Sequence, residues 1–172
     1  GYVSSCVPGG VSGYTPDAAT LAAARELVQD FSCSVASVCP SQPIHGLFLM
    51  GSLGTLAQTA QSDMDVWVCL APDLNDAAVS ALRKKCRRLE AWATSQGCEA
   101  HFFLIDAQLR NDEGDEPRQR LLLDEFYRTA IWLAGRTPMW WWVPVHEEAR
   151  YAEFACGLLE TGVIDRDETI DL

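Results

Sequence analysis

The sequence predicts an α/β (α+β) fold in which a small mixed sheet is packed with helices and followed by a helical C-terminal extension. Three apolar runs, at residues 44–50, 63–70 and 99–105, have the length and composition of buried strands. An amphipathic helical pattern separates the second run from the third, and further helical patterns follow the last one. The length of 172 residues fits one domain with an appended segment.

The chain opens with residues 1–14, which are rich in Gly, Ser, Val and Tyr and predict an irregular lead-in. A helix is predicted to begin at Thr15, Pro16 and Asp17. Thr is a favoured N-cap, Pro is tolerated at the first helical position, and Asp complements the helix dipole. Apolar residues recur at helical spacing up to Phe31, where we expect the helix to end.

The next elements are a strand over Ile44–Met50, a short helix from Leu53 to about Thr59, and a strand over Asp63–Leu70. Two carboxylates, Asp63 and Asp65, stand where the second strand begins. Because side chains alternate along a strand, residues two apart point to the same face. Like charges held this close repel, so the pair favours a bound cation.

A long amphipathic helix is predicted after Asn75 and Asp76, ending near Gly97, a good residue for a helix C-terminus. Its polar face carries five basic residues, namely Arg83, Lys84, Lys85, Arg87 and Arg88. Phosphate binding is one interpretation of this face, and a solvated helix surface is the one we favour. The third strand, Glu99–Ile105, follows.

Beyond the third strand, the charged segment 109–117 contains Gly and Pro and predicts a mobile loop. A helix is predicted from Arg118 to Leu133, with Asp124 and Arg128 spaced to form an ion pair. Three consecutive tryptophans at 140–142 are interpreted as packing residues. A last helix is predicted over 147–160.

Composition and net charge restrict the classes of function that fit this chain. The net charge of −11 argues against a nucleic-acid polymer as substrate and fits a small phosphorylated substrate delivered with Mg²⁺. Seven scattered cysteines, none in a C-x-x-C pair, indicate reduced thiols of a cytoplasmic protein. No apolar segment reaches the roughly 20 residues of a membrane span, and we expect no signal peptide. The chain opens without Met, which we interpret as a piece of a longer protein.

The pattern around the two aspartates resembles the signature of the DNA polymerase beta-like nucleotidyltransferase superfamily. That signature is an apolar residue, Gly-Ser, a spacer of about ten residues and an acidic pair flanked by apolar residues. Here these are Met50, Gly51, Ser52, and the pair Asp63 and Asp65. The resemblance implies a minimal nucleotidyltransferase core, which we place at residues 15–108, with 118–172 as its helical extension.

Such a core places a third carboxylate on its third strand, and two acids compete for this position. Glu99 and Asp106 lie seven residues apart, or about 23 Å along a strand, so only one can share the metal site. If the second and third strands run parallel and in register, their starts are level. Asp63, Asp65 and Glu99 all stand at strand starts, so we choose Glu99 and keep Asp106 as the alternative.

Three longer stretches narrow the resemblance. LFLMGSLGTLAQTAQSDMDVWVC at 47–69, RKKCRRLEAWATSQGCEAHFFLID at 83–106 and LLLDEFYRTAIWLAG at 121–135 resemble the catalytic portion of bacterial class I adenylate cyclases. Members of that family are longer, act in the cytoplasm and form cyclic AMP from ATP. They are regulated by the sugar phosphotransferase system through a C-terminal region. The resemblance therefore implies ATP as substrate and those partners.

The resemblance also implies residue roles. Asp63, Asp65 and Glu99 would bind two Mg²⁺ or Mn²⁺ ions, and Glu99 would help to take the proton of the ribose 3′-hydroxyl. Gly51 and Ser52 would grip the terminal phosphates. Arg128 would neutralise charge on the triphosphate.

Three other functions stay open at this point. The first is a nucleotidyltransferase that acts on a separate acceptor, and the second is a nucleotide-binding module that is inactive without the rest of the chain. The third is a phosphatase with an aspartyl nucleophile. In that third class the aspartates end an apolar strand, whereas here Gln61 and Ser62 precede them and the apolar run follows.

Overall fold

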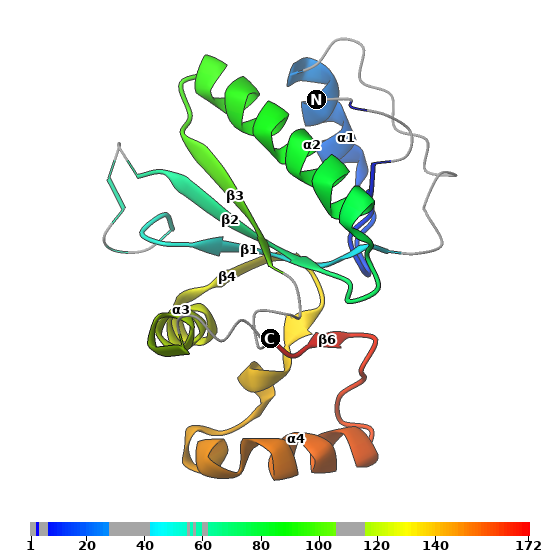
Figure 1. Cartoon of the computed structure of the whole chain (residues 1–172), viewed down its shortest axis with the longest axis vertical. Helices are drawn as coiled ribbons and strands as arrows, with labels where there is room; N and C mark the ends of the chain where they lie inside the picture. Colours follow the sequence, from blue (N-terminus) through cyan, green and yellow to red (C-terminus); the bar gives the residue numbers. More distant parts are fainter. Residues whose placement is uncertain are drawn as a thin grey trace.

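The computed structural model describes residues 3, 7–27, 42–54, 56, 58–59, 62–105 and 116–172 of the chain. Four strands form the central sheet, in the spatial order β3-β2-β1-β4. They are β1 (Ile44–Met50), β2 (Met64–Leu70), β3 (Ala100–Ile105) and β4 (Ile131–Gly135). β1 runs antiparallel to both β2 and β4, and β2 runs parallel to β3. The predicted α+β class with a small mixed sheet is therefore confirmed (Figure 1).

The helix α2 (Asp76–Ser95) covers one face of this sheet (Figure 1). Asn75 caps its start, since the side chain accepts a hydrogen bond from the Ala78 N–H at 2.9 Å. Leu82 and Cys86 are buried on its inner side and belong to the core cluster beneath the helix. The buried strand residues of this cluster are Ile44, Leu49, Val66, Val68 and Leu70. The predicted amphipathic helix is confirmed.

The helix α3 (Glu116–Thr129) packs against the opposite face, where Phe126 is fully buried among its residues whose side chains are described. Its ring stacks on Trp67 of β2 with centroids 5.2 Å apart, and meets Phe48 of β1 edge to face at 4.9 Å. Such aromatic pairs contribute about 0.5–1.5 kcal/mol beyond their buried area. β2 is therefore packed between α2 on one face of the sheet and α3 on the other.

The predicted helix from Arg118 to Leu133 is wrong at its C-terminal end. α3 stops at Thr129, and the following residues form β4, which pairs with β1 through Leu49↔Ile131 and Phe48↔Trp132. Leu133, the last residue of the predicted helix, lies in β4 and is 48% exposed. The open edge of β1 explains the change, because its unpaired backbone groups need a partner. The β-branched and aromatic residues at this point also suit a strand.

The predicted short helix from Leu53 to Thr59 is absent from the part of this segment that is described. Residues 51–54 form turns instead, with Gly51 at φ +82° and Gly54 at φ +77°. A right-handed helix requires negative φ, so these two glycines exclude it at the start of the segment.

The first helix, α1 (Ala18–Leu27), begins slightly later than predicted. The Asp17 carboxylate accepts a hydrogen bond from the Thr20 N–H at 2.7 Å, which lowers the pKa of Asp17, so the cap is Asp17 rather than Thr15. The expected apolar face is not covered, since α1 has no buried residue. The predicted end at Phe31 lies outside the described residues. The predicted loop at 109–117 falls largely outside them as well.

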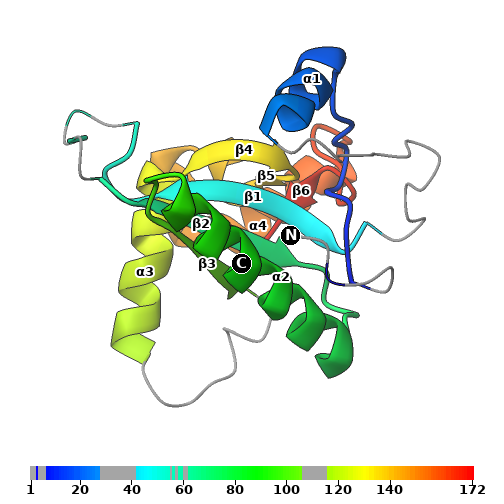
Figure 2. The ribbon, with the colours of Figure 1, turned by 90° about the horizontal axis from the view of Figure 1, so that it is seen from above.

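The C-terminal segment lies below the sheet in Figure 1 and combines short strands with helices. These are β5 (Thr137–Pro138), η3 (Met139–Trp142), η4 (Val145–Arg150), α4 (Tyr151–Glu160) and β6 (Thr169–Ile170). Figure 2 shows the same elements from above, behind the sheet. Trp140 stacks on Tyr127 at 5.1 Å and lies 5.4 Å from the ring of Tyr151, so the packing interpretation of this tryptophan is confirmed. None of the helices within the described ranges is both long and apolar enough to cross a bilayer.

Candidate functional site

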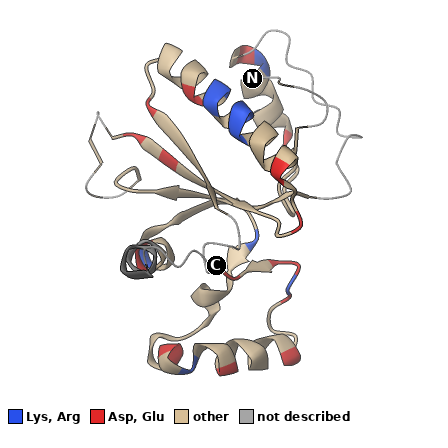
Figure 3. Ribbon diagram, in the orientation of Figure 1, with Lys and Arg blue, Asp and Glu red and all other residues tan. Residues whose placement is uncertain are grey.

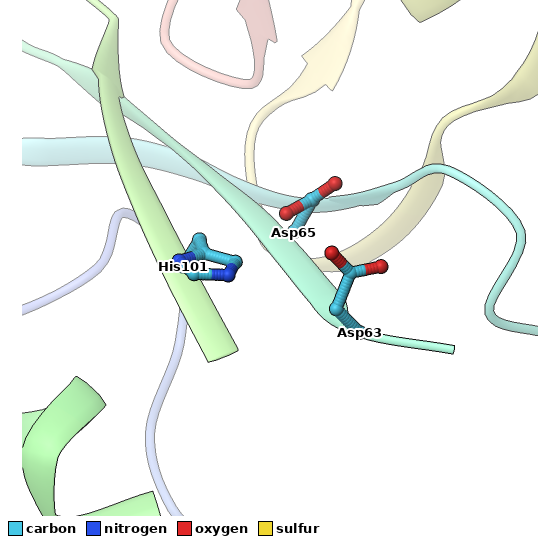
Figure 4. Close-up of side chains that lie close together, drawn as sticks. All are labelled: Asp63, Asp65 and His101. Atoms are coloured by element: carbon cyan, nitrogen blue, oxygen red, sulfur yellow. The ribbon is translucent and has the colours of Figure 1, made fainter. Parts of the chain in front are cut away.

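Three side chains meet where β2 and β3 begin. Asp63, Asp65 and His101 each offer a ligand atom, and these three atoms all lie within 4.8 Å of one another. Figure 4 shows the two carboxylates of the β2 strand and its lead-in beside the imidazole of β3. We refer to these three residues as the acidic cluster.

The register of the two parallel strands creates this meeting. Met64 pairs with Ala100 and Asp65 pairs with His101, and the Met64 N–H donates to the Glu99 carbonyl at 2.9 Å. Paired residues of neighbouring parallel strands point to the same face of the sheet. The parallel, level arrangement predicted for these two strands is therefore confirmed, and it brings a histidine beside Asp65.

Glu99, predicted as the third ligand, lies just before β3 and outside the group of three ligand atoms. Its side chain is 71% exposed, and its Oε1 lies 3.3 Å from His101 Nε2. The alternative, Asp106, lies outside the described residues. The direct metal-binding role of Glu99 stays a prediction. Sequence reasoning missed His101 because it compared only acids, although the expected strand register already placed position 101 level with Asp65.

Negative charge dominates the electrostatics of the cluster. Partial burial raises the pKa of Asp65, and the neighbouring Asp63 and Glu99 carboxylates raise it further, while His101 acts in the opposite direction. Figure 3 shows these acidic positions together at the starts of β2 and β3. An added positive charge would relieve this repulsion.

The turn that contains Gly51 and Ser52 approaches the cluster from the end of β1. Met50 pairs with Asp65, and a Cβ built on Gly51 would lie 3.6 Å from Asp65 Oδ2. The Ser52 and Ser62 hydroxyls lie 2.9 Å apart, which ties the turn to the residue just before Asp63. The predicted Gly-Ser dipeptide and acidic pair are thus neighbours in space. Phosphate binding by the turn stays a prediction.

Arg128 lies in the last turn of α3. Its Nε donates to Asp124 Oδ1 at 2.8 Å, as the i,i+4 spacing predicts, and its Nη2 lies 3.7 Å from Glu148 Oε2. These carboxylates raise the pKa of Arg128. The guanidinium is engaged by local acids in this structure, and its role at a triphosphate stays a prediction.

A pocket of about 620 Å³ opens beside Glu99 and His101. The α2 residues Arg87 and Glu90 line its other side. Glu90 Oε1 accepts a hydrogen bond from the Phe102 N–H at 2.9 Å, so the open edge of β3 is partly capped. Arg87 is therefore a basic residue of the α2 polar face that borders a pocket next to the acidic cluster.

The donor set of the cluster suits a divalent cation. Carboxylate oxygens are the ligands that Mg²⁺ and Mn²⁺ prefer, and one imidazole extends the set toward transition metals. Asp63 is exposed and Asp65 and His101 are partly exposed, so the site is open on one side to a substrate. An open, oxygen-rich site of this kind suits a metal that is shared with a phosphorylated ligand.

Comparison with known proteins identifies the relatives of this chain. Residues 1–141 match the family described as "Adenylate cyclase NT domain". The whole chain aligns with the protein named "Adenylate cyclase" from Shigella flexneri at 37% identity over 182 residues, and with that of Escherichia coli (strain K12) at 37% over 182 residues. The Yersinia pestis protein of the same name is 36% identical over 190 residues. The chain spans only 22%, 22% and 21% of the lengths of these three relatives.

Solved structures give a weaker comparison. One described as "Crystal structure of the toxin-antitoxin with AMP-PNP" aligns with a TM-score of 0.35 and 17% identity, over 79% of this chain and 83% of that one. A second toxin–antitoxin structure gives the same TM-score at 15% identity. A TM-score at this level does not establish a shared fold.

Proposed function

The chain belongs to the adenylate cyclase N-terminal domain family, and on that premise we propose that it forms the metal- and ATP-binding core of a longer adenylate cyclase. The proposed reaction converts ATP to 3′,5′-cyclic AMP and pyrophosphate. The ribose 3′-oxygen forms a bond to the α-phosphorus of the same ATP, the bond from that phosphorus to the bridging oxygen breaks, and the 3′-hydroxyl proton is lost.

The observation that carries this proposal is the acidic cluster beside the Gly51–Ser52 turn. The carboxylates of Asp63 and Asp65 lie close enough together to bind one cation, and their mutual repulsion favours a cation between them. The two aspartates begin β2 rather than end it, which disfavours the phosphatase alternative.

Each side chain has a part in this proposal. Asp63 and Asp65 would hold the divalent cation, which would supply positive charge to activate the 3′-hydroxyl and to stabilise the leaving oxygen. The backbone of Gly51, free of a Cβ, lets the turn approach the terminal phosphates closely, and Ser52 offers a hydroxyl to them. Glu99, exposed at the rim, helps to remove the 3′-hydroxyl proton.

The rest of the longer protein enters the proposal as well. The chain spans 22% of the length of its Shigella flexneri relative. A protein of that length has room for the regulatory C-terminal region that the family resemblance implies. We place the protein in the cytoplasm, where ATP and the sugar phosphotransferase system are available. Mg²⁺ is the proposed cofactor, with Mn²⁺ as a substitute.

The test separates cyclisation from transfer to another molecule. The full-length protein is incubated with 3′-deoxy-ATP, which lacks the attacking hydroxyl, and with 2′-deoxy-ATP as the matched control that retains it. We expect 3′-deoxy-ATP to compete with ATP at similar affinity and to yield no pyrophosphate, because no hydroxyl stands at near-attack distance from its α-phosphorus. 2′-Deoxy-ATP should be cyclised.

A transferase with a separate acceptor gives the opposite result. It would release pyrophosphate from 3′-deoxy-ATP once a cell extract supplied the acceptor. Binding of both analogues without any pyrophosphate from ATP itself would favour a nucleotide-binding module instead.

A further inference from the structure

We propose that His101 is a direct nitrogen ligand of the cation held by Asp63 and Asp65, and that Glu99, in addition to its proposed part in removing the 3′-hydroxyl proton, orients the imidazole of His101. This inference rests on the proposed function, because it concerns the same cation site. It replaces an all-carboxylate site with a mixed site of two oxygen donors and one nitrogen donor.

The backbone makes the placement of His101 specific. Position 101 is fixed opposite Asp65 by a continuous parallel ladder from Met64↔Ala100 to Cys69↔Ile105. The ladder residues on the face of His101 include Ile105, which is buried in the α3-side core. His101 is thus attached to a packed strand rather than to a loop, and its Cα cannot move away without disrupting that core.

The contact with Glu99 supplies the second part of the argument. Histidines that bind metals commonly donate their other ring N–H to a carboxylate, which fixes the tautomer and the ring orientation. Here Glu99 Oε1 lies 3.3 Å from His101 Nε2. When Nε2–H donates to this carboxylate, the lone pair is on Nδ1, which is therefore the proposed ligand atom.

A nitrogen ligand changes which metal the site prefers. Imidazole suits transition metals, whereas carboxylates and water suit Mg²⁺. A site with His101 should therefore bind Mn²⁺ more tightly relative to Mg²⁺ than the same site with an oxygen donor at position 101. The class of cofactor that follows is a divalent transition metal that accepts both oxygen and nitrogen, with Mn²⁺ as the probe.

The experiment uses pulsed electron paramagnetic resonance on the full-length protein with bound Mn²⁺. Direct nitrogen ligation produces ¹⁴N modulation of the echo, a signal that does not depend on turnover. We expect this modulation in the wild-type protein and its loss in His101→Gln, together with a rise of roughly 10-fold to 100-fold in the Mn²⁺ dissociation constant. His45→Gln is the matched control, because His45 lies at the other end of the sheet, and it should leave both quantities unchanged.

Two further variants sharpen the test. His101→Asp, which supplies an oxygen donor, should lower the ratio of Mn²⁺ affinity to Mg²⁺ affinity. Glu99→Gln should keep the ¹⁴N modulation while weakening Mn²⁺ binding by roughly 10-fold, as expected of a residue that acts through the histidine. If His101→Gln fails to fold by its melting curve, His101→Asn replaces it.

The outcomes separate this inference from the proposed function. Modulation that persists in His101→Gln, or its absence from wild-type protein that binds Mn²⁺, overturns the role of His101. Loss of Mn²⁺ binding in Asp63→Asn with no effect of His101→Gln overturns this inference alone. Unchanged Mn²⁺ binding in Asp63→Asn overturns the cation site and the proposed function with it.

Discussion

The two ends of the central sheet carry different arrangements of charge. At one end, where Met50 pairs with Asp65, partial burial and the carboxylates of Asp63 and Glu99 raise the pKa of Asp65. At the other end, where Ile44 pairs with Leu70, a pocket of about 430 Å³ is lined by both acidic and basic residues. The same two strands therefore connect an end with excess negative charge to an end with mixed charge.

The second end is organised around His45 and Arg136. Burial lowers the pKa of His45, Arg136 lowers it further, and Asp73 and Asp167 act in the opposite direction. The Arg136 N–H donates to the His45 carbonyl at 2.7 Å, and its Nη1 donates to the Arg166 carbonyl at 3.0 Å. Side chains of both signs are thus present in one pocket.

This difference in charge between the two ends indicates where an added cation would stabilise the protein. At the second end, the protein places the positive charge of Arg136 in the same pocket as Asp73 and Asp167. At the first end, Asp63 and Asp65 lie beside the imidazole of His101. The imbalance at that end, rather than the number of acids, marks the acidic cluster as the place for a metal.

The two ends should differ most in activity when the acidic pair of each end is neutralised in turn. In the full-length protein, Asp63→Asn with Asp65→Asn should lower the rate of cyclic AMP formation by at least 10²-fold to 10³-fold, the typical loss for one removed charge-stabilising group. The matched pair Asp73→Asn with Asp167→Asn should leave the rate unchanged. Initial rates with Mg²⁺ measure both variants. Equal losses in the two pairs would contradict the distinction between the ends.

Phe126 packs against Phe48 of β1 and Trp67 of β2, the two strands that join the two ends. Its removal should therefore lower the stability of the whole sheet. Phe126→Ala removes the stacked contact with Trp67 and the edge contact with Phe48, and should lower the free energy of unfolding by about 3–5 kcal/mol. Phe103→Ala is the matched control, because Phe103 is 46% exposed, and it should cost about 1 kcal/mol or less. Denaturant unfolding of the chain measures both values, and a similar cost for the two variants would contradict the packing assigned to α3.

A glycine with positive φ stands at each end, and the two should respond differently to alanine. A Cβ on Gly135, at φ +96°, would lie 2.7 Å from Gly46 Cα, so backbone must shift, and we expect a loss of roughly 3 kcal/mol or more. Among the described residues, a Cβ on Gly51, at φ +82°, meets only Asp65 Oδ2 at 3.6 Å, so we expect the cost of a left-handed backbone, about 1–2 kcal/mol.

The two glycine variants also separate stability from activity. Gly51→Ala should impair ATP turnover in the full-length protein more than its small stability cost explains, because a side chain would enter the turn beside the acidic cluster. Melting curves and initial rates on the same preparations provide this comparison. A larger stability loss for Gly51→Ala than for Gly135→Ala would contradict the assignment.

The smallest expected effect concerns the pH dependence contributed by His45. Because its pKa is lowered in the folded chain, the unfolded chain binds more protons in the range just below the ordinary value of about 6.5. Stability from this residue is therefore fully present above that value and decreases as the pH falls toward the folded pKa. His45→Gln should flatten the slope of unfolding free energy between about pH 7.5 and 5.5. A slope identical to that of the wild type would contradict the burial of His45.

Features that depend on neighbours along the chain could be predicted from the sequence. The alternation around Asp63 and Asp65 placed two carboxylates at the start of β2, and the spacing of Leu82 and Cys86 determined the inner side of α2. Asn75 caps α2 as its residue type predicts. These properties follow from side-chain periodicity and from hydrogen bonds over three or four residues, which a local pattern encodes.

Features that depend on pairing between distant segments became apparent in the folded chain. Ile131 and Trp132 continue a helical pattern in the sequence, yet they form β4 because β1 offers an open edge to them. His101 belongs to the acidic cluster because the β2–β3 register sets it opposite Asp65, across 36 residues of sequence. Backbone pairing satisfies hydrogen bonds without regard to side-chain identity, so the residues it brings together cannot be deduced from local composition.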